Sequence, residues 1–74
     1  MKIEYHDHGK TASVIITSTV FEFRKHIRVV DVTLFLTPEV TPESSGFFIM
    51  KTVLSGKTAD ASRAYRIALK EAQR

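Results

Sequence analysis

Four basic side chains near the end of the sequence are the residues best placed to do chemistry. They recur at intervals of three and four residues: Arg63, Arg66, Lys70 and Arg74. At 100° per residue they fall within about 80° of one another on a helix. Aligned guanidinium and ammonium groups bind phosphates or carboxylates, and Ile67 adds an apolar contact among them. The same stripe is also typical of a solvated outer helix face, whose cations suit the helix C-terminus.

An amphipathic helix after Gly56 is needed to align these cations. Apolar residues recur at three- and four-residue spacing on its opposite face: Ala61, Ala64, Tyr65, Ala68, Leu69 and Ala72. Ser55-Gly56 ends the preceding element, and Thr58 or Asp60 is expected to cap the helix. The segment after Gly56 has five basic and two acidic residues, whereas the first 56 residues have six of each. The net charge of +3 is therefore concentrated in this helix.

The tetrapeptide Ser55-Gly56-Lys57-Thr58 invites comparison with a phosphate-binding P-loop. That motif requires a glycine five residues before the Gly-Lys pair, where this chain has Lys51. A weaker alternative is that Lys57 and free amides at the helix start hold one anion. The competing interpretation is a plain turn and helix cap.

Other chemistry-bearing residues form no convincing site. His6 and His8 flank Asp7, and His26 could approach them, but no second spaced motif supports a metal. Ser13, with His8 and Asp7, lacks a nucleophile elbow and an oxyanion site. We therefore predict no metal, no cofactor and no enzymatic activity.

The rest of the chain is predicted to form short strands joined by turns and a loop. Apolar alternation, β-branched residues and turn signals predict strands over 2–6, 12–23, 27–36 and 47–54, with a turn at 7–10, a bulge or bend at 17–19 and an exposed loop at 37–46. In the third strand Val30, Val32, Leu34 and Leu36 form the expected core face. The predicted fold class is α+β, a four-stranded, mainly antiparallel sheet with one C-terminal amphipathic helix packed on one face.

One helix cannot cover both faces of such a sheet. The uncovered face is expected to carry Phe35, Phe47, Ile49 and Val53, which could bury against a second copy or another protein. The alternative is that the loop or the second strand folds over them.

Size and composition limit the class of protein. With 74 residues, 43% of them hydrophobic, we expect one folded domain. No cysteine is present, so neither disulfides nor thiolate metal sites can support a core that rarely supplies more than ~3–5 kcal/mol. Binding to a partner or dimerisation would add stability. Neither a signal peptide nor a membrane span is recognisable, and a cytoplasmic location is expected.

Two resemblances follow from these features. The segment Thr58–Leu69, with its Ala-Arg-Ala-Tyr run, resembles the helix of AP2-type DNA-binding domains over about a sixth of the chain, with a one-residue gap. The arginine- and tryptophan-rich strands with which that family reads DNA are absent. In size and format the chain is similar to small phage-encoded inhibitors, including anti-CRISPR proteins, a group that no motif defines.

The sequence thus predicts a small non-enzymatic binding module. Its expected role is an accessory or inhibitor protein of a phage or mobile element, occupying a surface of a nucleic-acid-handling protein complex. The expected contacts are the helix cations, Ile67, Lys57 and the proline-containing loop. The alternative hypothesis is direct DNA or RNA binding by the same cations, with affinity that falls steeply as salt rises.

Overall fold

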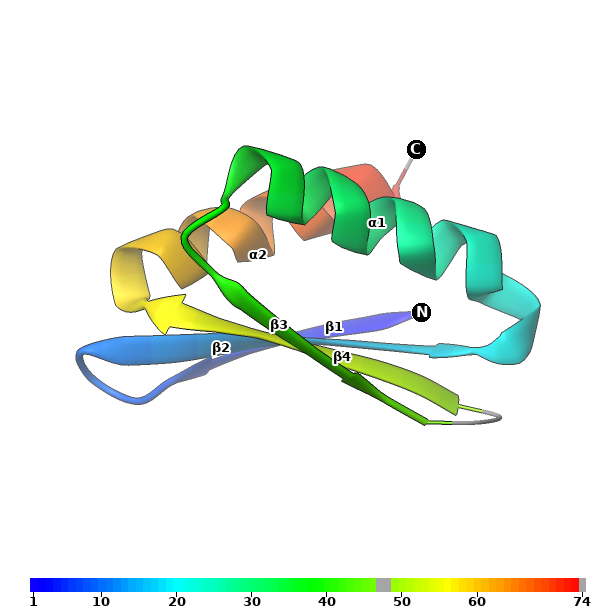
Figure 1. Ribbon diagram of the computed structural model, residues 1–74, viewed down its shortest axis with the longest axis horizontal. Helices are drawn as coiled ribbons and strands as arrows, with labels where there is room; N and C mark the ends of the chain where they lie inside the picture. The colour runs from blue at the N-terminus through cyan, green and yellow to red at the C-terminus, as the bar shows by residue number, and fades with distance from the viewer. Residues whose placement is uncertain (47–48, 74) are drawn as a thin grey trace.

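The computed structural model describes residues 1–46 and 49–73. The elements follow one another as β1 (Lys2–Asp7), β2 (Thr11–Thr19), the short 3₁₀ turn η1 (Val20–Glu22), α1 (Phe23–Leu36), β3 (Thr41–Ser45), β4 (Ile49–Lys57) and α2 (Thr58–Ala72). Both helices lie on the same side of the sheet and leave its other face uncovered (Figure 1). Within the described residues, neither helix is long and apolar enough to cross a membrane.

The sheet joins two hairpins through their second strands. Its order is β1-β2-β4-β3, and all three neighbouring pairs are antiparallel. The central pair aligns Ile15 with Val53. Each hairpin is followed by a helix, so the chain forms two ββα halves whose helices pack against each other. The edge strands are β1 in the first half and β3 in the second.

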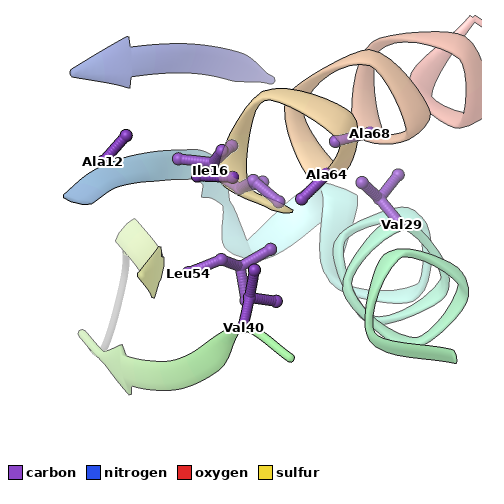
Figure 2. Packing of buried hydrophobic residues seen from close by; sticks show 9 residues of the cluster. Ala12, Ile16, Val29, Val40, Leu54, Ala64 and Ala68 are labelled. Carbon is purple, nitrogen blue, oxygen red and sulfur yellow. The ribbon is translucent and has the colours of Figure 1, made fainter. Parts of the chain in front are cut away.

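The core lies between the central strands and the two helices. Ile16 of β2 and Leu54 of β4 are fully buried in one cluster with Ala64 and Ala68 of α2 (Figure 2). Because alanine projects only a methyl group, α2 can lie close against the sheet. Val29 adds the contribution of α1 to the same cluster. The α+β fold class and the packing of the C-terminal helix on one face are therefore confirmed.

Strict alternation along β2 decides which side chains face the helices. Ala12, Val14, Ile16 and Ser18 are buried, whereas the intervening residues are partly or fully exposed. The register of β2 with β4 places Thr52 and Leu54 on the helix side and Ile49 and Val53 on the uncovered side. The first hairpin and the faces assigned to Ile49 and Val53 match the sequence-based prediction.

The strand predicted over 27–36 is wrong, because this segment belongs to the helix α1. The expected core face of Val30, Val32, Leu34 and Leu36 is wrong with it. The buried residues of α1 are His26, Val29 and Thr33, whose spacing of three and four is that of a helix. β-branched residues favour strands only where a sheet accommodates them. In this fold the segment packs as a helix on the surface formed by α2 and the sheet, rather than as a strand within the sheet.

Three smaller expectations also change. The second strand ends at Thr19, at the break that was expected as a bulge or bend, and the chain leaves the sheet there. The loop predicted over 37–46 contains the edge strand β3. The N-cap of α2 is Lys57, which has extended backbone, rather than Thr58 or Asp60. The Thr58 hydroxyl instead donates a hydrogen bond to the carbonyl oxygen of Gly9.

Candidate binding surface

The cations predicted on α2 form an exposed ridge opposite its alanine face. Arg63, Arg66 and Lys70 are all exposed, while Ala61, Ala64 and Ala68 are fully buried. An Arg63 guanidinium nitrogen lies 3.5 Å from the Glu39 carboxylate, an exposed pair that adds little stability. Among the described residues, neither Arg66 nor Lys70 has a carboxylate within ion-pair distance. These two charges are available to a partner.

The other predicted members of this site lie elsewhere. The register of β4 with β2 places Lys57 on the uncovered side of the sheet, away from the ridge. The first amide of α2, that of Thr58, donates a hydrogen bond to the carbonyl oxygen of Lys10 at 3.2 Å. That amide is therefore not free to bind an anion together with Lys57. Arg74 lies outside the described residues.

Ile67 lines a shallow groove between the two helices. The opposite wall of the groove comes from Val32 and Leu36 of α1, and Lys70 and Glu71 border it. Leu36 is half exposed, and Ile67 is partly exposed. The ridge thus lies beside an apolar depression to which both helices contribute.

The first helix adds cations that the sequence analysis did not include in the site. Arg24 and Lys25 fall between two of the predicted strands and Arg28 falls within the strand predicted over 27–36, but all three lie on α1. The two helices hold three basic residues each, against one acidic residue in α1 and two in α2. The helical spacing of His26, Val29 and Thr33 was the signal that could have placed these cations on a helix.

An ion pair joins the two helices beneath this surface. Arg28 Nε lies 3.3 Å from a carboxylate oxygen of Glu71. The Glu71 residue is 7% exposed, whereas the Arg28 side chain is about half exposed. The Glu71 charge is therefore held inside the helix pair, and the outer surface carries the positive charges.

The predicted apolar sheet face is only partly present. Ile49 and Val53 lie on the uncovered side of β4, where Val53 is beside Ile15 of β2 and Ile49 is beside Thr19. The assignment of Phe35 to this face is wrong, because Phe35 is on α1 and is 83% exposed there. Phe47 lies outside the described residues. Serine, threonine and lysine side chains occupy much of the rest of this face.

His26 connects α1 to the sheet through hydroxyl groups. Its Nδ1 lies 2.5 Å from Ser18 Oγ, and its Nε2 lies 2.7 Å from Thr52 Oγ1. The Thr52 hydroxyl is in turn 2.9 Å from Ser44 Oγ. Burial lowers the pKa of His26, against a smaller opposing effect of the Glu22 charge. A neutral imidazole satisfies this chain of hydroxyls by donating from one nitrogen and accepting at the other.

The three histidines do not converge. His26 is buried between α1 and the sheet, whereas the register places His6 on the uncovered side of β1, and His8 lies in the first turn. Ser13, the serine considered for catalysis, pairs with His6 across the two strands and faces the uncovered side with it. The described residues contain no group of three potential metal ligands.

The strongest candidate site is therefore the outer surface of the helix pair, in which the ridge of α2 borders the apolar groove. Comparisons with protein-family models, with curated proteins and with solved structures found no match to this chain.

Proposed function

We propose that this chain is a non-enzymatic binding module that docks the outer surface of its helix pair onto an acidic surface of a larger protein. The observation that carries the proposal is that cations without an ion-pair partner in the described part of the chain lie close to exposed apolar side chains. Lys70 borders the groove that Ile67 lines, Arg66 lies four residues before Lys70 on the same ridge, and Phe35 projects from α1 with 83% of its surface exposed. An apolar centre with a charged rim is the usual anatomy of a protein interface.

The partner's chemistry follows from this anatomy. On the partner, carboxylates would pair with the cations of the rim, and an apolar side chain between them would fill the groove between Leu36 and Ile67. Phe35, exposed on the outer side of α1, would add apolar area to such a contact. In its finer form the proposal names a nucleic-acid-handling complex as the partner, and an accessory or inhibitory role in a phage or mobile element.

The competing function is direct binding of DNA or RNA by the ridge. From Arg63 to Lys70 the ridge spans seven residues, about 10 Å of helix. Three phosphate contacts over that length would give a log–log salt slope of about −3 and only weak affinity at physiological salt. The apolar groove would then have no partner, so a protein surface accounts for more of the site.

Charge-reversal variants test whether this surface, rather than another part of the molecule, binds the partner. The variant Arg66→Glu/Lys70→Glu should reduce capture of the partner from the native host by about tenfold or more, since each rim contact becomes repulsive. The matched control is Lys10→Glu/Lys51→Glu, which changes the net charge equally at two exposed lysines outside the helices. Circular dichroism should show both variants folded. Equal capture by the two variants would refute the proposal.

A gel-shift titration with DNA and RNA at two salt concentrations tests the competing function. Binding that is tight at low salt, lost at high salt and absent in the ridge variant would favour nucleic acid over protein. No shift at low salt would remove nucleic acid from consideration.

A further inference from the structure

A second groove lies on the other flank of α1, over the edge of the sheet. Its volume is about 320 Å³, and its walls include Phe23, Ile27 and Val30 of α1, with Met50 of β4. The floor is polar, formed by the hydroxyls of Ser44 and Thr52 beside His26. Phe23 is 50% exposed and Ile27 is 41% exposed. The helix therefore presents an apolar stripe that the described residues leave partly exposed.

The strand beneath this groove is itself open. All five residues of β3 are exposed, and β3 is the last strand in the sheet. On the helix side it offers only Pro42 and Ser44, whose small side chains leave the groove unfilled. A groove above an unpaired edge is suited to the addition of another strand.

Pro42 determines which backbone groups of β3 point outward. Proline has no N–H, so in an antiparallel pair it occupies a position whose backbone groups face away from the neighbouring strand. Pro42 lies opposite Leu54 of β4, and hydrogen-bonded and non-hydrogen-bonded positions alternate along the pair. The N–H and C=O of Ser44, two residues on, therefore also point away from the sheet. They are free to pair across the edge.

We infer that this edge and its groove bind a second copy of the chain. Two β3 strands related by a two-fold axis at Ser44 would exchange the N–H and C=O groups of the two Ser44 residues. This joins the sheets into one of eight strands with all helices on the same side. Glu43 of one copy would then lie opposite Ser45 of the other, so the pairing brings no like charges together.

The charges of the first helix are complementary about the same axis. Ile27 lines the same groove as Ser44, so an axis through Ser44 passes near Ile27 and sets the two α1 helices antiparallel. On a helical wheel Arg24 and Asp31 lie about 60° and 40° from Ile27, on the same side. Their midpoint along the helix falls beside Ile27. The axis therefore brings Arg24 of each copy opposite Asp31 of the other, which gives two complementary charge pairs.

Measuring the mass in solution tests the pairing. Light scattering coupled to gel filtration should give twice the chain mass of 8.4 kDa for the wild type. Ile27→Glu should give the monomer, because a carboxylate would be buried in the groove. The control is Phe35→Glu, the same change at an exposed position on the outer side of α1, which should remain dimeric. A wild type that stays monomeric at every concentration, or a dimer lost only in Phe35→Glu, would overturn the inference.

The strand edge has its own matched pair of variants. Ser44→Pro removes the outward N–H while keeping the bonds to β4, as Pro42 already does, and should dissociate the dimer. Ser44→Ala removes the contact with the Thr52 hydroxyl but keeps the N–H, and should remain dimeric. Dissociation of both variants alike would contradict pairing through this edge.

A charge exchange tests the register even if the proline variant fails to fold. Arg24→Asp and Asp31→Arg should each weaken dimerisation about five- to tenfold, because each disrupts two symmetric pairs. The double variant Arg24→Asp/Asp31→Arg restores opposite charges across the axis and should recover the wild-type dissociation constant. Additive weakening in the double variant would refute the antiparallel arrangement of α1.

Discussion

Arg28 and Glu71 pair across the two helices, with 3.3 Å between the guanidinium Nε and a carboxylate oxygen. Because the two helices belong to different halves of the chain, this contact fastens one ββα half to the other. It also turns a buried acidic charge inward, beneath a surface that is otherwise basic.

The first prediction concerns this ion pair. Arg28→Ala should lower the free energy of unfolding by about 0.5–1 kcal/mol, a small effect because the arginine side chain is half exposed. Urea denaturation at low and high salt measures it, and the difference from wild type should shrink at high salt. Arg66→Ala, at an exposed position of the other helix without an ion-pair partner among the described residues, is the control and should change stability less. Equal losses in the two variants would argue against the pair.

The second prediction is a pH dependence set by His26. Burial lowers its pKa in the folded protein below the usual 6.5, so the unfolded chain binds more protons between the two pKa values. Stability contributed by the neutral imidazole is fully present above pH 6.5 and falls as the pH decreases toward the folded pKa. Urea midpoints measured between pH 7.5 and 5.5 should therefore decrease.

Histidine variants identify the group responsible. His26→Gln should lower stability at neutral pH and flatten the change between pH 7.5 and 5.5. The variant His8→Gln changes only an exposed imidazole and should retain the wild-type dependence. A dependence that survives in His26→Gln would show that another group controls it.

The third prediction contrasts two buried threonines at the end of α1. The Thr33 hydroxyl has no hydrogen-bond partner within the described chain, so Thr33→Val should raise the free energy of unfolding by about 1 kcal/mol. The Thr37 hydroxyl donates to the Thr33 carbonyl oxygen, so Thr37→Val should lower it by about 1 kcal/mol. Chemical denaturation of the two isosteric variants measures both effects. A loss of stability in Thr33→Val would mean that its hydroxyl is satisfied.

The fourth prediction compares two glycines with positive φ. Gly46 has φ of 116°, and a Cβ there would lie 1.9 Å from the Ile49 carbonyl oxygen. Gly9 has φ of 94° and nothing within 4 Å of such a Cβ. Gly9→Ala should therefore cost only backbone strain, about 1 kcal/mol, whereas Gly46→Ala must also displace the strand backbone and should cost clearly more. Thermal unfolding of both variants measures the difference, and equal costs would contradict the close approach at Gly46.

The sequence by itself determined the elements whose signals are local. Alternation of Ile3 and Tyr5 with polar neighbours specified β1, and the residues 7–10 specified the turn. The alanine spacing of α2 specified both the helix and the outward direction of Arg66 and Lys70, since a helix that buries one face must expose the opposite one. These features depend on neighbours within a few residues, so the order of the residues was sufficient.

Only the tertiary structure decided the state of the segment from Phe23 to Leu36. Its valines and Thr33 suit a strand as well as a helix, because β-propensity reflects the surface on which a side chain packs. Val29 and Thr33, at helical spacing, are buried against α2 and the sheet, and β3 is the edge strand beside β4. As a result, Phe35 lies on the helix surface rather than in the sheet, and Ile27 lines the same groove as Ser44. Both proposed binding surfaces thus depend on contacts between residues distant in the sequence.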